Sequence, residues 1–398
     1  MNLRNRKSAG LERLPYDTLK VIFGCLSAAA FYITWGRSLL DGTLMQILAL
    51  RGAKTPSVPG TNEPLRMTFT GIVPVDYWFT IMVLFFWEAL DGSHPDTSLT
   101  GVYFLGQLVG IWMLVWLEGA RAGSLKTVVS WTVMWACAMQ NLTLACFGPI
   151  FYTLCLAVRW PGNGAPSKDA LLIRPLDLRV LPFSVFLGYI LPSVSMALPS
   201  PGIVSFRTQQ AVISVWTFFP VWVGAIHAIL SRVAVSLGMA GAARSPQAHL
   251  VNARVLYAIT IVVTTVVHVA IVTLSLSTVL FPALYTPSTL AAFAPAHLLF
   301  PTASGIVASI GEGVLNFMLL DQYIGYGSTL LWAAVLHWDS LQRLSVLQVI
   351  GAGMISICGC LVCGPASVAV GLVWARDEVV LSAEEDMVGG KCSVSRNL

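Results

Sequence analysis

Nine predominantly apolar stretches run through this chain, and each is long enough to cross a lipid bilayer as a helix. Only 11% of the 398 residues are charged and 56% are hydrophobic, whereas soluble globular proteins carry about 25% charged residues. The pattern therefore predicts an all-α fold, a polytopic transmembrane helix bundle with about nine spans; eight or ten spans also fit the pattern. The apolar windows lie near residues 18–36, 71–90, 101–120, 127–158, 179–198, 208–235, 252–280, 306–338 and 346–374.

Two of these windows, 127–158 and 306–338, exceed the thickness of one bilayer. Pro149 lies inside the first window and is expected to kink or split its helix. Gly325 and Gly327 lie inside the second window, which predicts either one long bent helix or a short interfacial piece followed by a span.

The chain shows no internal repeat and no soluble domain. We predict a single transmembrane helical domain over residues 1–375 and a polar, disordered tail over 376–398. The N-terminus is basic and the loop near 281–305 has no Lys or Arg, which favours a cytosolic N-terminus and a lumenal position for that loop. The first loop carries four basic residues against this pattern. We expect an integral protein of the endoplasmic reticulum membrane.

Two acidic residues end apolar runs that are otherwise fit to cross a membrane. Glu88 follows Ile81–Trp87, and Asp321 follows Val314–Leu320. A carboxylate inside a bilayer costs about 2.5–3.5 kcal/mol on insertion scales, so such a residue predicts a functional site. Loss of water also raises the pKa of a carboxylic acid and keeps it protonated. We predict that Glu88 and Asp321 are catalytic proton donors.

Each of these acids also has a structural interpretation. Gly92 and Pro95 follow Glu88 closely, so the helix could end there and place the acid at the lipid headgroups. Asp321 could make a hydrogen bond between helices, worth about 1 kcal/mol.

Other polar residues near these acids are supporting candidates. Asp91 is three residues from Glu88 and shares a helix face with it, although it too could reach the headgroups. Glu118 and Arg121 have the spacing of an ion pair within one helix, which is the favoured interpretation of that pair. The supporting candidates are Asp91, Glu118, Glu312, Asn316, Gln322 and Tyr323.

Aromatic residues cluster around the same segments. Ring faces attract cations by roughly 0.5–2 kcal/mol each, so these residues could line the path of a carbocation. Tryptophan also anchors helices at the membrane interface, and that alternative stays open. The candidates for cation stabilisation are Phe86, Trp87, Trp112, Trp116 and Trp135.

Several catalytic motifs are missing from the sequence. It has no DDxxD or NDxxD run to hold Mg²⁺ and pyrophosphate, and no phosphate-binding loop, HExxH or GxSxG motif. Weak metal-binding alternatives are the Asp91–His94–Asp96 loop and the cysteines at 358, 360 and 363. We expect no metal, no cofactor, no nucleic-acid partner and no obligate protein partner. The glycosylation match at Asn141 lies in an apolar helix and should be silent.

The run Phe85–Glu88, which closes one span ahead of a short loop, resembles the fungal membrane-bound terpene cyclases of meroterpenoid pathways. In their compact seven-helix, pyripyropene-type branch, a Trp–Glu pair on an early helix and an Asp on the last helix form the acid site. Glu88 and Asp321 match these positions, although another span follows Asp321 here. The length and the runs Leu319–Gly325 and Leu330–Ala333 are more similar to the longer branch, which includes the ascofuranone and macrophorin cyclases.

This resemblance implies a proton-initiated cyclisation of the farnesyl chain of a prenylated aromatic or cyclohexenone. The reaction would start at a terminal epoxide or alkene, without a metal or redox cofactor. Either Glu88 or Asp321 would act as general acid, and the other would orient it or connect to the final base. The expected partners are a small hydrophobic prenylated substrate and membrane lipid.

A proton-coupled transporter or efflux protein is the alternative function, because intramembrane acids also serve in proton relays. Many transporters have a two-fold internal repeat, which this sequence does not show. A receptor or scaffold without chemistry is a third alternative.

Overall fold

The computed structural model describes residues 15–159, 167–239, 243–302, 305–341 and 345–382. In these segments every regular element is helical, apart from an isolated bridge between Ser57 and Pro64. The predicted all-α class is therefore confirmed.

The helices of the first half run from α1 to α10. Their bounds are α1 Tyr16–Phe31, a π-helical turn Tyr32–Gly36, α2 Arg37–Leu40, α3 Thr43–Arg51, α4 Val73–Glu88, α5 Pro95–Ala120, α6 Thr132–Leu142, α7 Leu144–Arg159, α8 Lys168–Leu171, α9 Pro175–Val185, a π-helical turn Phe186–Ile190 and α10 Leu191–Met196.

The second half contains the two longest helices, α13 and α16. The bounds are α11 Phe206–Thr217, α12 Phe219–Ser236, α13 Pro246–Leu280, α14 Pro287–Phe293, α15 Pro295–Leu299, α16 Ile310–Ser340, α17 Val346–Cys363 and α18 Pro365–Ser382. Short 3₁₀ turns occur at Val128–Ser130 and Pro282–Leu284.

Five helical segments of the described chain are long and apolar enough to cross a membrane, which indicates a membrane protein. The predicted number of about nine is not confirmed, because several apolar windows form shorter or interrupted helices. The window 71–90, for example, contains only the 16-residue α4. The five segments are Tyr16–Leu40, Pro95–Ala120, Phe219–Ser236, Pro246–Leu280 and Val346–Cys363.

The two long windows agree with the prediction in part. The first breaks at Thr143, whose φ of 77° separates α6 from α7. A split at Pro149, one of the two effects expected of that proline, is wrong, because it lies within α7. The second window forms one continuous helix, α16, as in the first predicted alternative; a short interfacial piece followed by a span is wrong.

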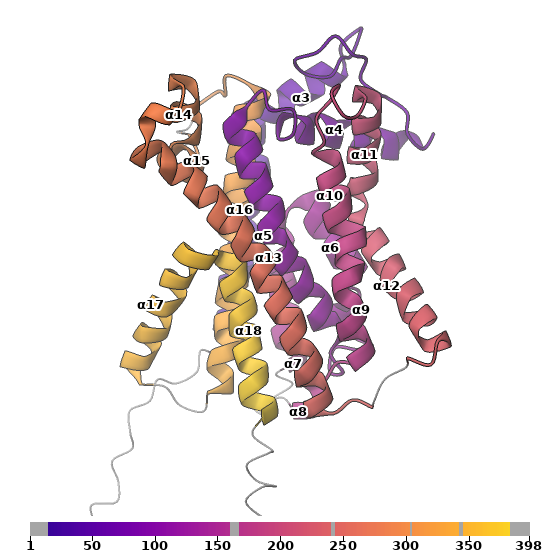
Figure 1. Cartoon of the computed structure of the whole chain (residues 1–398), viewed down its shortest axis with the longest axis vertical. Helices are drawn as coiled ribbons and strands as arrows, with labels where there is room; N and C mark the ends of the chain where they lie inside the picture. The colour runs from indigo at the N-terminus through magenta and orange to yellow at the C-terminus, as the bar shows by residue number, and fades with distance from the viewer. Residues whose placement is uncertain (1–14, 160–166, 240–242, 303–304, 342–344, 383–398) are drawn as a thin grey trace, which may run out of the picture.

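Helix α16 lies at the centre of the bundle, packed against α5, α7 and α18, while α13 packs on α5 and α18 (Figure 1). Close approach depends on small residues: Gly106 on α5 faces Val267 on α13, and Gly110 faces Ala366 on α18. Small residues at helix interfaces are typical of membrane bundles. Trp332 and Val314, both fully buried, place α16 within the main apolar core.

Helix α17 stands at the edge of this bundle (Figure 1). None of its residues is buried, and Leu347, Ile355 and Leu361 are all more than 70% exposed. A helix that is apolar on all sides suits contact with lipid.

The predicted tail boundary at residue 376 is wrong. Helix α18 continues to Ser382, and Arg376 and Asp377 are buried in the bundle. They stay helical because they pair with charged groups on neighbouring helices, as detailed below. Residues 383–398, and the basic residues predicted to set the N-terminal orientation, lie outside the described segments.

A glycine on the π-helical turn Phe186–Ile190 allows α12 to approach. A Cβ at Gly188 would lie 2.7 Å from the backbone N and 2.8 Å from the Cα of Val223. We expect Gly188→Ala to lower the free energy of unfolding by about 1–3 kcal/mol, because the backbones must separate. Gly371 on α18 has open space around it, so Gly371→Ala should be neutral or stabilising by up to about 1 kcal/mol. Thermal unfolding in detergent measures the stability of both variants. Equal stabilities of Gly188→Ala and Gly371→Ala would contradict a close backbone contact at Gly188.

Candidate active site

A largely apolar cavity of about 740 Å³, including its open mouth, lies among the helices of the upper half of the bundle. The lining comes from segments far apart in the sequence, from the π-helical turn before α2 to α16. Six aromatic residues contribute to it: Trp35, Phe85, Phe86, Phe104, Trp112 and Phe317.

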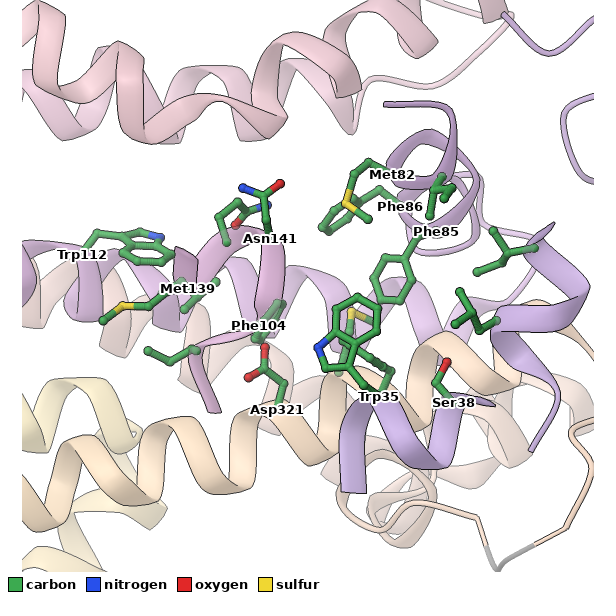
Figure 2. Close-up of a pocket in the computed structure, with 18 residues that line it drawn as sticks. Trp35, Ser38, Met82, Phe85, Phe86, Phe104, Trp112, Met139, Asn141 and Asp321 are labelled. Carbon is green, nitrogen blue, oxygen red and sulfur yellow. The ribbon is translucent and has the colours of Figure 1, made fainter. Parts of the chain in front are cut away.

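Four polar side chains line the cavity: Ser38, Gln140, Asn141 and Asp321. Among the described lining residues, Asp321 is the one acidic side chain. It is 4% exposed, and Figure 2 shows its carboxylate pointing from α16 toward Phe104 and Asn141. An acid enclosed by apolar and aromatic side chains is suited to transfer a proton to an apolar ligand.

The break between α6 and α7 fixes the position of this carboxylate. The first N–H groups of a helix have no partner within the helix, and Ala145 is the second residue of α7. Its N–H donates a 2.7 Å hydrogen bond to Oδ1 of Asp321. The hydrogen bond between helices, expected as the structural alternative for this residue, is therefore present beside the cavity.

Glu88 occupies a different place. It is 4% exposed at the last position of α4 and does not line the cavity. Its Oε2 lies 3.5 Å from Nε2 of His94, a side chain that is 33% exposed. The His94 ring in turn packs directly on Gly311 of α16. Glu88 thus connects the end of α4 to the start of α5, and the structure does not place it beside Asp321 on the cavity wall.

The other polar candidates near the two acids also lie outside the cavity lining. Asp91 is exposed and accepts hydrogen bonds from the N–H and hydroxyl of Ser93 in a turn. Glu312 and Asn316 bind the Thr302 segment: Glu312 accepts from its hydroxyl, and Asn316 bonds to its N–H and hydroxyl. Gln322 is buried away from the cavity, and Tyr323 is half exposed.

Glu118 belongs to a buried ionic network at another level of the bundle. The predicted ion pair with Arg121 is confirmed, with Arg121 Nε 2.8 Å from Oε1 of Glu118. Arg121 also binds Asp377 of α18 at 3.0 Å, and Arg376 pairs with both acids. His249 and the Tyr257 hydroxyl contact Asp377 from α13. The network joins α5, α13 and α18, which is a structural role.

Two of the five aromatic candidates, Phe86 and Trp112, line the cavity. Trp87 packs against Phe206, and the indole of Trp135 donates to the carbonyl of Val128. Trp116 is buried in the core away from the lining.

In the described segments, no group of three or more His, Cys, Asp or Glu side chains is arranged to hold a metal ion. The loop acids and histidine considered above make separate contacts: His94 lies beside Glu88, and Asp96 beside His297 at 2.7 Å.

Comparison with known proteins identifies the family. The CtvD domain matches residues 19–381, nearly the whole described chain. The chain belongs to the CtvD family. It is similar to terpene cyclase ctvD of Aspergillus terreus, with 26% identity over 361 residues, 89% of this chain and 97% of the relative. It is also similar to terpene cyclase ascI of Acremonium egyptiacum, with 27% identity over 381 residues, 94% of this chain and 95% of the relative. No solved structure matches significantly.

Family membership confirms the resemblance to fungal terpene cyclases of meroterpenoid pathways. A third relative, terpene cyclase penA of Penicillium crustosum, is 25% identical over 367 residues, 88% of this chain and 93% of the relative. The relatives are matched along almost their entire length, so the similarity to the CtvD family covers the cavity-forming helices together.

The sequence interpretation of this CtvD-family chain missed several cavity residues. Phe104 precedes Trp112 by eight residues and Phe317 precedes Asp321 by four, spacings that place each pair on one helix face. That periodicity could have found them. Trp35 and Gln140 have no such signal. Asn141 was considered only as a glycosylation match, whereas it belongs to the cavity lining.

Proposed function

We propose that this chain is an integral-membrane terpene cyclase that cyclises the farnesyl chain of a prenylated aromatic or cyclohexenone. The observation that carries the proposal is Asp321, a buried acid on the wall of a cavity with six aromatic residues. Relatives of this chain in the CtvD family carry the name terpene cyclase. These names favour a cyclase over the alternative of a proton-coupled transporter.

The proposed reaction begins with proton transfer from Asp321. The proton goes to the oxygen of a terminal epoxide, whose C–O bond to the dimethyl-substituted carbon breaks, or to the less substituted carbon of the terminal alkene; either step leaves a tertiary carbocation. The resulting carbocation is attacked by the next double bond, and ring closure continues along the chain until a proton is lost. One proton enters and one leaves, so the product is an isomer of the substrate. This balance requires no electron acceptor, no metal and no redox cofactor.

The cavity contributes to this reaction through its shape and its rings. The faces of Trp112, Phe104 and Phe86 stabilise positive charge as it moves along the chain. A cavity without bulk water prevents early capture of the cation. Glu88 acts as a positioning residue, because its contact with His94 fixes the end of the helix that carries Phe85 and Phe86. The protein functions in the endoplasmic reticulum membrane with its N-terminus in the cytosol.

The proposal is tested with microsomes from cells that express the protein. They are incubated with a farnesylated phenol or its terminal epoxide, without added metal, and the extracts are compared by LC–MS with microsomes that lack the protein. A new product of unchanged mass is the expected result. If neither compound yields an isomer while the protein is present at normal levels, the proposed substrate class is wrong.

The aromatic lining gives a graded prediction. Trp112→Leu removes a ring face from the cavity, and a loss of about 0.5–2 kcal/mol of cation stabilisation corresponds to a rate about 2- to 30-fold lower. Products quenched at an earlier cation should increase, and Trp112→Phe should restore much of the rate. The control is Trp135→Leu, outside the cavity lining, which should leave the product ratio unchanged. Equal effects of Trp112→Leu and Trp135→Leu would argue against cation stabilisation by Trp112.

A further inference from the structure

The junction between α6 and α7 supplies a cluster of polar groups to an otherwise apolar cavity. Gln140 and Asn141 precede the break at Thr143, and Asp321 is bound to Ala145 just after it. Three of the four polar side chains of the lining therefore gather around one helix break. The rest of the wall, apart from Ser38, is aliphatic, aromatic or methionine.

Asn141 has a fixed orientation. The indole N–H of Trp78 donates a 2.6 Å hydrogen bond to Oδ1 of Asn141. An indole nitrogen can only donate, so the amide oxygen must face Trp78. The amide nitrogen then donates a 2.8 Å hydrogen bond to the carbonyl of Cys137. Asn141 is thus anchored to the protein and has limited capacity for a ligand.

Gln140 is different. Its Nε2 is buried and has no hydrogen-bond partner among the described residues. A buried amide donor without a partner loses its hydrogen bond to water and gains none in return, a cost that a ligand acceptor would remove. Gln140 lines the cavity, so a bound ligand can supply that acceptor once the amide turns toward it.

We propose that the Gln140 amide donates a hydrogen bond to an oxygen at the reacting end of the bound chain, beside Asp321. Gln140 then determines specificity, because it selects a chain that ends in oxygen over one that ends in hydrocarbon. This role rests on the proposed function, in which the farnesyl chain occupies this cavity with its terminus at Asp321. A buried donor left unpaired by the wrong ligand is a strong source of discrimination.

Two unreactive ligands test this role by binding alone. One is the farnesylated phenol with a saturated terminus, and the other carries a tertiary alcohol at the same end. Dissociation constants are measured with detergent-purified wild type and Gln140→Met, which keeps the length of the side chain but removes the donor. The expected result is a 10- to 100-fold weaker affinity of Gln140→Met for the alcohol and an unchanged affinity for the saturated ligand.

The control is Gln247→Met, an exposed glutamine on α13 outside the cavity lining, which should bind both ligands like wild type. Equal weakening for both ligands would show that Gln140 only shapes the cavity, and no weakening would show that other groups bind the oxygen; either result overturns the role. Isomer formation by wild type tests the proposed function separately.

Discussion

The substitution Asp321→Asn is expected to lower the rate of cyclisation by at least about 100-fold, because a positioned general acid contributes about 10²- to 10⁴-fold. Asparagine has the same shape as aspartate, and its amide oxygen can still accept the hydrogen bond from the N–H of Ala145. The start of α7 should therefore keep its partner. What is lost is a proton acidic enough to start the reaction. Isomer formation by microsomes at matched protein levels measures the effect.

Two comparisons make this result specific. Glu88→Gln should reduce the rate about tenfold or less, since Glu88 contacts His94 and lies outside the cavity lining. Glu312→Gln, which retains an acceptor for Thr302, should leave the rate near that of wild type. Wild-type activity in Asp321→Asn would eliminate it as the general acid. A larger loss in Glu88→Gln than in Asp321→Asn would assign the proton donor to the end of α4.

The second large effect concerns stability. Arg121→Met removes one of the two arginines shared by Glu118 and Asp377, in a region where these three side chains are at most 1% exposed, and leaves Arg376 as the other. The hydrogen bond from Arg121 to the carbonyl of Leu171 is lost as well. We expect the free energy of unfolding to fall by about 3–5 kcal/mol, because two acids then share one arginine and a buried negative charge lacks its partner. Thermal unfolding in detergent or the loss of monodisperse protein on heating measures this change.

Another ion pair made by α18 offers a matched control. Arg254 on α13 pairs with Glu378 on α18 through contacts of 2.7 and 2.8 Å, but its side chain is half exposed. Arg254→Met should cost only about 0–1 kcal/mol, as for other ion pairs in contact with solvent. Similar losses in the two variants would mean that burial does not determine the strength of this network.

The sequence allowed several of these features to be predicted because local spacing determined them. The i, i+3 spacing of Glu118 and Arg121 predicted their ion pair, although it could not show Asp377, which is 256 residues away from Arg121. The class of fold followed from apolar windows. The number of spans did not, because hydropathy alone does not show where a helix breaks: Thr143 interrupts one window although threonine has no strong preference for positive φ.

The candidate active site was predicted only in part, because the spacing of residues along a helix does not show where a cavity ends. Glu88 follows Ile81 by seven residues, so it lies on the helix face that carries Ile81 and Phe85 into the cavity. Periodicity shows the direction of a side chain around the helix but not how far along the helix a cavity extends. Here the lining contributed by α4 ends at Phe86. For Asp321 the direction and the depth both place the side chain in the cavity.

The hydrogen bond from α7 to Asp321 has a consequence for the moments after proton transfer. The proposed reaction leaves a carboxylate next to a newly formed carbocation, and the two would attract each other and could combine. The N-terminus of α7 carries the positive end of the helix dipole, which stabilises a negative charge placed against it. The N–H of Ala145 also occupies an oxygen of the carboxylate. These two interactions make the Asp321 carboxylate a weak nucleophile. The positive charge can then move along the farnesyl chain toward the aromatic rings.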